Sequence, residues 1–73
     1  MEVLSGTHKK LGQRIKELRG GLNMTQEDLA IKVGVDRSYM GFIERGEKNP
    51  RLSMLDKIAK TLKVPLSELF QSI

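Results

Sequence analysis

The chain has 73 residues, of which 38% are hydrophobic and 30% charged, a net charge of +4 and no cysteine. A chain of this length forms one domain that buries only about 60% of its unfolded surface, and the lack of cysteine excludes a disulfide framework and any Cys-based metal site. No apolar run approaches the roughly 20 residues that cross a bilayer, so we expect no membrane contact and a cytoplasmic location, while the basic excess favours a polyanionic partner.

The chain is expected to begin with a flexible leader over residues 1–6, which show no clear periodicity, followed by a single domain over 7–73. Thr7 is positioned to cap a first helix that runs to about Arg19 and ends at Gly20 and Gly21. Its apolar residues recur at helical spacing and are Leu11, Ile15, Leu18 and, just beyond, Leu22.

Two short helices are expected next, over 26–33 and 37–45. Thr25 is a favourable N-cap for the first, and Gly34 supplies the left-handed residue that ends it. Asp36 caps the second in the same way. Helices joined across so short a turn cannot continue one axis, so they must cross steeply, which predicts a helix-turn-helix.

The second of these helices has two different sides. Met40 and Ile43 share one side and are expected to point into the core. The outward side carries groups that can donate to base edges, reach phosphates or touch a thymine methyl, namely Arg37, Ser38, Gly41 and Phe42, with Tyr39 and Arg45 at its flanks.

A polar loop over 46–52 follows, and Ser53 is expected to cap a fourth helix. The buried side of that helix is formed by Leu55, Ile58, Ala59 and Leu62. Pro65 stops the chain from continuing as one helix and suits the start of a last short one over 66–71. Five helices without a repeat or linker predict a compact all-α domain.

Three large apolar residues, Leu66, Phe70 and Ile73, lie near the end of the chain. They either complete the core or form a surface shared between two copies, and the residues alone leave both alternatives open. The second alternative predicts a homodimer.

The order of these pieces resembles the lambda-repressor-like, XRE-type family of DNA-binding domains, which includes Cro, phage repressors and the small controller proteins of restriction-modification systems. The matching segments are LGQRIKELR, MTQEDLAIKVGV, RSYMGFIERGEKNP, LDKIAKTL and VPLSELF, which together span about residues 11–70. The resemblance is strongest to the controller proteins, and it implies a five-helix fold that binds double-stranded DNA.

The resemblance also implies roles for particular residues. Arg37 and Ser38 stand where the family reads bases, and an arginine can bind guanine O6 and N7 together. Gln26 stands where the family grips a phosphate at a helix N-terminus. Arg19 and Glu44 correspond to an internal ion pair. Further contacts with the DNA backbone are expected from Arg45 and from the loop residues Lys48, Asn49 and Arg51.

Two aromatic residues allow more than one role. Phe42 departs from the family, which often has a small or polar residue there, so it either touches a thymine methyl or covers the edge of the core. Tyr39 either donates its hydroxyl to a phosphate or packs against the end of the preceding helix.

These expectations predict a sequence-specific transcription regulator, of repressor or controller type, that binds a pseudo-palindromic operator as a dimer. An antitoxin-like or adaptor module on the same fold, which would bind a protein partner instead, is the alternative. We expect no enzymatic activity, because no nucleophile or acid pair comes with a base at workable spacing. We also expect no cofactor, no metal and no small-molecule effector.

Overall fold

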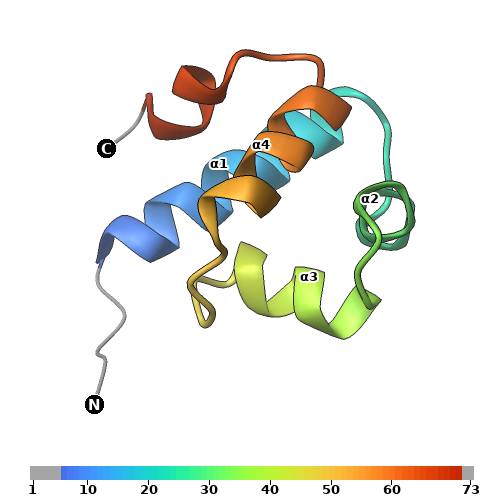
Figure 1. The fold of residues 1–73 in the computed structure, drawn as a ribbon, viewed down its shortest axis with the longest axis horizontal. Helices are drawn as coiled ribbons and strands as arrows, with labels where there is room; N and C mark the ends of the chain where they lie inside the picture. The colour runs from blue at the N-terminus through green and yellow to red at the C-terminus, as the bar shows by residue number, and fades with distance from the viewer. Residues whose placement is uncertain (1–5, 72–73) are drawn as a thin grey trace.

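The computed structural model describes residues 6–71 and is helical throughout its ordered elements (Figure 1). Four α-helices and a short 3-10 helix follow one another: α1 (Gly6–Gly21), α2 (Gln26–Val33), α3 (Arg37–Glu44), α4 (Leu52–Thr61) and η1 (Leu66–Phe70). The described residues contain no strand. The all-α class and the order of the helices are therefore confirmed, although the last element is a 3-10 helix that ends one residue before the expected limit.

All five elements contribute to one core. α2 packs against α3 and α4, while η1 closes the far side against α1 and α4. The buried apolar residues keep the helical spacing of the sequence and are Leu11, Ile15, Leu29, Ala30, Val33, Met40, Ile43, Leu55, Ile58, Ala59, Leu62 and Leu69. A core shared in this way fixes α3 from its inner side and leaves the other side at the edge of the molecule (Figure 1).

The caps of α2 are those that the sequence predicts. Thr25 Oγ1 accepts a hydrogen bond from the Asp28 backbone at 3.0 Å, and the Asp28 carboxylate accepts one from the Thr25 backbone at 2.9 Å. This reciprocal capping box satisfies two amides that the helix leaves unpaired, and its hydrogen bonds lower the pKa of Asp28. Gly34 ends the helix with φ of 80°, in the left-handed region that favours glycine.

The turn into α3 is also held by a side chain. Asp36 Oδ2 accepts a hydrogen bond from the Ser38 backbone at 2.9 Å, as expected of an N-cap. The predicted helix-turn-helix is thus fixed at both ends of its turn, so the orientation of α3 relative to α2 follows from local chemistry.

Gly12 sets the contact between α1 and α3. A Cβ at this position would overlap the backbone carbonyl of Ile43 and lie 2.5 Å from that of Glu44. Only glycine permits this approach, which brings the C-terminal end of α3 directly onto α1.

Three expected helix limits are wrong. α1 begins at Gly6, so Thr7 lies inside the helix and does not cap it; residues 1–5 of the expected leader lie outside the described residues. α1 also continues through both glycines, because the left-handed stop is supplied by Asn23 with φ of 58°. Ser53 does not cap α4 either, since the helix already begins at Leu52 and Arg51 occupies the N-cap position without a side-chain hydrogen bond.

One long-range ion pair, between Arg14 and Glu68, was not predicted. Arg14 Nη2 donates to Glu68 Oε2 at 2.9 Å, and Arg14 Nε donates to the Glu68 backbone carbonyl at 3.1 Å. These bonds join α1 to η1 across 54 residues of sequence and hold the short last helix against the bundle.

Candidate nucleic-acid interface

α3 presents a polar, exposed side and an apolar, buried side. Arg37 and Ser38 are exposed in its first turn, whereas Met40 and Ile43 are 0% and 1% exposed. Tyr39 lies between the two sides, half-buried against the core. The hydrophobic contacts therefore anchor the helix, while its first two residues are accessible to a partner.

Gly41 does not lie on the outward side, so that part of the prediction is wrong. It is buried beneath two long side chains: a Cβ there would lie 3.0 Å from Arg45 Nη1 and 3.3 Å from Gln26 Oε1. The helical period alone placed Gly41 outside, but Gln26 reaches across from α2 and covers it.

The carboxylate of Glu44 is the centre of a buried polar network. It accepts from Arg19 Nε at 2.7 Å, from Arg19 Nη2 at 3.0 Å and from Gln26 Nε2 at 3.1 Å. The remaining Arg19 nitrogen donates to the Met24 carbonyl at 2.8 Å. The ion pair that the resemblance implied is therefore present, and its hydrogen bond raises the pKa of Arg19.

The network also places Gln26 at the N-terminal end of α2, beside the C-terminal end of α3. A polar hollow opens here, lined by three basic side chains, from Lys9, Lys16 and Arg45, and by the carboxylates of Glu44 and Glu47. Cations near the N-terminal end of a helix suit a phosphate group, whereas the two carboxylates oppose one.

The C-terminal end of α3 carries a cluster of charges around an aromatic ring. Phe42 is 37% exposed, with Arg45 Cζ at 5.1 Å and Lys48 Nζ at 5.6 Å from its ring centroid. Arg45 Nε also donates to Glu47 Oε1 at 3.1 Å. The loop residues Asn49 and Arg51 are exposed as well, so the candidate surface includes both α3 and this loop.

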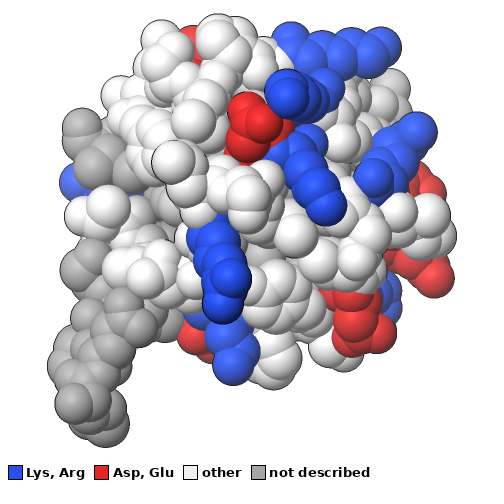
Figure 2. Space-filling model, viewed as in Figure 1, with Lys and Arg blue, Asp and Glu red and all other residues white. Residues whose placement is uncertain are grey.

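Basic side chains do not gather into one patch on the face of the molecule that is in view in Figure 2. Figure 2 shows basic side chains in several separate groups on the face in view, with acidic groups between them. The candidate interface is therefore defined by the geometry of α3 and its neighbours rather than by a single basic patch.

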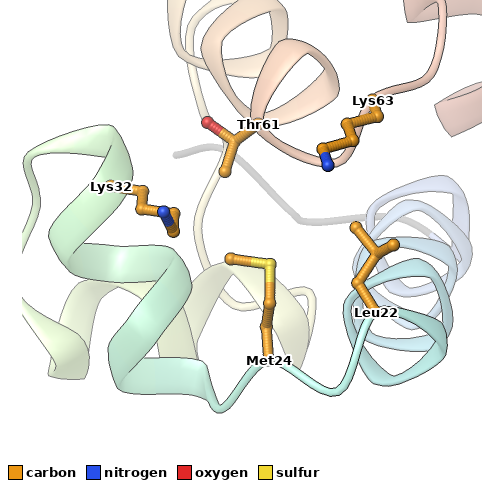
Figure 3. Close-up of a pocket in the computed structure, with 5 residues that line it drawn as sticks. All are labelled: Leu22, Met24, Lys32, Thr61 and Lys63. Carbon is orange, nitrogen blue, oxygen red and sulfur yellow. The ribbon is translucent and has the colours of Figure 1, made fainter.

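A second hollow lies elsewhere, between the C-terminal ends of α1 and α4 and the side of α2 (Figure 3). Leu22 and Met24 point into it from one side, while Lys32, Thr61 and Lys63 approach it from the others. No residue of α3 lines it, so it is separate from the candidate interface.

The C-terminal residues behave differently from one another. Leu66 is half-buried and packs on the core, whereas Phe70 is 38% exposed; Ile73 lies outside the described residues. Leu69 completes the core from η1 with no exposed surface. Phe70 therefore remains accessible to a second copy.

Two other features are absent from residues 6–71. This part of the chain contains no group of three His, Asp or Glu side chains placed to hold a metal ion. None of its helices combines the length and the apolar character that a membrane span requires.

The chain is similar to known proteins of one family. Residues 15–69 match the Helix-turn-helix family HTH_3. The chain is similar to an uncharacterized HTH-type transcriptional regulator of Archaeoglobus fulgidus, with 46% identity over 57 residues that make up 78% of this chain and 80% of that protein.

Two solved structures are similar over most of the chain. The restriction-modification controller protein C.AhdI from Aeromonas hydrophila superposes with a TM-score of 0.87 and 42% identity, covering 90% of this chain and all of the other. The biofilm master regulator SinR, a Bacillus subtilis protein solved in complex with DNA, gives a TM-score of 0.76 and 38% identity, covering 81% and 95% of the two chains.

Proposed function

This chain belongs to the helix-turn-helix family HTH_3, as its sequence predicts, and from that premise we propose that it regulates transcription by reading a pseudo-palindromic operator as a homodimer through α3. Its relatives include an HTH-type transcriptional regulator, a restriction-modification controller protein and a regulator solved in complex with DNA, and the operator symmetry and the dimer are our extension. The observation that carries the proposal is the two-sided packing of α3, which leaves Arg37 and Ser38 exposed while Met40 and Ile43 hold the helix.

The residues divide into two kinds of contact. Arg37 and Ser38, with their exposed side chains at the N-terminal end of α3, are assigned to base edges, where an arginine can bind a guanine through two hydrogen bonds. Contacts with the DNA backbone are assigned to residues of α3 and of the segments next to it, namely Gln26, Tyr39, Arg45, Lys48, Asn49 and Arg51. Backbone contacts fix the register of the helix in the groove, and base contacts select the sequence.

A dimer follows from the energetics of such sites. One half-site offers few base contacts, and two recognition helices about 34 Å apart in successive major grooves supply both affinity and selectivity. The exposed ring of Phe70 on η1 is the surface that we assign to the second copy. The likeness to the restriction-modification controller protein C.AhdI supports a controller role.

The proposal is tested by footprinting the purified protein on DNA selected from a random pool. We expect two protected half-sites related by two-fold symmetry and about one helical turn apart. Arg37→Ala should weaken protection of this site, whereas Lys57→Ala, an exposed lysine on α4, should leave it unchanged. Uniform protection without a preferred site, or recovery of the chain only with a stoichiometric protein partner and no DNA affinity, would contradict the proposal.

A further inference from the structure

The ring of Phe42 lies next to two cations that come from different parts of the chain. Arg45 is the C-cap residue of α3, and Lys48 follows the turn at Gly46. Their charged groups lie 5.1 and 5.6 Å from the ring centroid, both within the distance of about 6 Å at which a cation is attracted to an aromatic face.

The backbone explains why Lys48 returns to this ring. Gly46 has φ of 75°, a left-handed conformation that reverses the chain after α3. The Glu47 N–H then donates to the Phe42 carbonyl at 2.8 Å, which closes the turn at the residue whose ring receives the lysine. The pairing of Phe42 with Lys48 is thus set by the fold of the turn.

Arg45 is held from three directions. Its Nε donates to Glu47 Oε1, its Nη1 lies against Gly41, where a Cβ would approach it to 3.0 Å, and its guanidinium carbon lies over the Phe42 ring. Its side chain is nevertheless 55% exposed, so its terminal nitrogens remain accessible to an acceptor.

From this cluster we propose that Phe42 is a positioning residue: its ring presents Arg45 and Lys48 together to one segment of the DNA backbone at the C-terminal end of α3. The inference rests on the proposed function and assigns Phe42 a role other than contact with a thymine methyl. Long cationic side chains lose rotamer freedom when they bind, and holding them in place beforehand reduces that cost.

The two roles of Phe42 differ in what they do to DNA binding. A thymine contact affects one base position and leaves non-specific binding unchanged. A platform for two backbone-binding cations affects all sequences alike and alters the dependence of affinity on salt, because each phosphate neutralised by a cation releases counterions.

The test compares Phe42→Leu, Phe42→Tyr and Lys48→Ala, alone and combined, on the selected operator and on a random duplex over a range of salt concentrations. Leucine keeps an apolar contact but has no ring face, whereas tyrosine keeps the ring. We expect Phe42→Leu to lower the affinity for both DNAs by a similar factor, about fivefold or more, and to reduce the dependence of affinity on salt concentration. The affinities of Phe42→Tyr should stay within about twofold of those of the wild type.

A double-mutant cycle gives the sharpest result. If the ring acts through Lys48, the effect of Lys48→Ala on affinity should be smaller in the Phe42→Leu background than in the wild type. Circular dichroism and thermal unfolding of each variant establish that the fold is retained, and the Arg45 side-chain proton shifts should lose their ring-current displacement in Phe42→Leu.

The inference is overturned if Phe42→Leu binds both DNAs as wild type does, or if it changes the preference at one base pair while random-duplex affinity is unchanged. Strictly additive effects of Phe42→Leu and Lys48→Ala would also overturn it. These outcomes leave the proposed function intact, whereas wild-type protein that binds no DNA would overturn both.

Discussion

Replacing Glu44 with alanine is expected to destabilise the fold more than any exposed substitution. The Glu44 side chain is 2% exposed and that of Arg19 is 13% exposed, and the carboxylate accepts three hydrogen bonds, at 2.7, 3.0 and 3.1 Å. Its removal leaves the Arg19 guanidinium desolvated with only the Met24 carbonyl as a retained acceptor. Loss of one partner from a buried pair costs about 3 to 5 kcal/mol.

That cost is large for this chain. At roughly 0.05 to 0.15 kcal/mol per residue, 73 residues have a total stability of about 4 to 11 kcal/mol. Glu44→Ala is therefore expected to remove about half of the free energy of unfolding, and to populate unfolded chains near physiological temperature.

The assay is urea unfolding at neutral pH and one fixed protein concentration, because association would make stability depend on concentration. Asp56→Ala is the matched control: its partner Lys60 lies at 3.0 Å, but the two side chains are 48% and 76% exposed, so about 0.3 to 0.5 kcal/mol is expected. A Glu44→Ala cost below about 1 kcal/mol would refute the reasoning from burial.

A paired replacement separates the charge effect from general disruption. The double variant Arg19→Met with Glu44→Met removes both charges and keeps apolar volume, so it should be more stable than Glu44→Ala alone. If the double variant is less stable than the single one, the unpaired guanidinium is not the source of the loss.

Three further predictions follow from other parts of the fold. Gly12→Ala should lower the free energy of unfolding, measured by thermal unfolding, by about 1 to 3 kcal/mol, because its Cβ meets the backbone of α3. Gly20→Ala, with open space around it, should raise the free energy of unfolding by about 0.5 to 1 kcal/mol. Equal effects of the two substitutions would contradict the close approach of α1 and α3. Because the pKa of Asp28 is lowered in the folded state, its charge stabilises the fold above the unfolded pKa of about 3.9, and this contribution is lost as pH falls through the folded pKa. The difference in free energy of unfolding between wild type and Asp28→Asn should therefore shrink below about pH 4. A difference that stays constant with pH would contradict this assignment. Phe70→Glu should yield monomers in sedimentation and weaken operator binding, while Phe70→Tyr should not; wild-type protein that stays monomeric at high concentration would refute the dimer.

Three of the predicted caps act in the structure as the sequence indicates. Thr25, Gly34 and Asp36 carry their capping signals within four residues of the hydrogen bonds that they make or the turn that they form, and all three act in the structure as expected. The buried side of α4 and the buried apolar residues Met40 and Ile43 of α3 likewise follow from helical spacing.

Some of the missed features depend on how the chain folds back on itself, whereas the wrong limits at Thr7 and Ser53 are local capping signals that the structure does not use. Gly41 has a position on the outward arc of its helix, yet Gln26 covers it from another helix. Arg14 reads as one of several basic residues of α1, and only the fold brings Glu68 to it. The pairing of Phe42 with Lys48 likewise requires the reversal of the chain at Gly46.

The central claim is that the exposed first turn of α3 reads base identity, and parallel selection from a random DNA pool with wild-type protein and Arg37→Ala tests it most directly. The wild type should enrich a two-fold symmetric sequence, and the variant should enrich the same sequence with preference lost at one guanine per half-site and affinity lowered by about 1 to 3 kcal/mol. An identical preference in both proteins would contradict the claim.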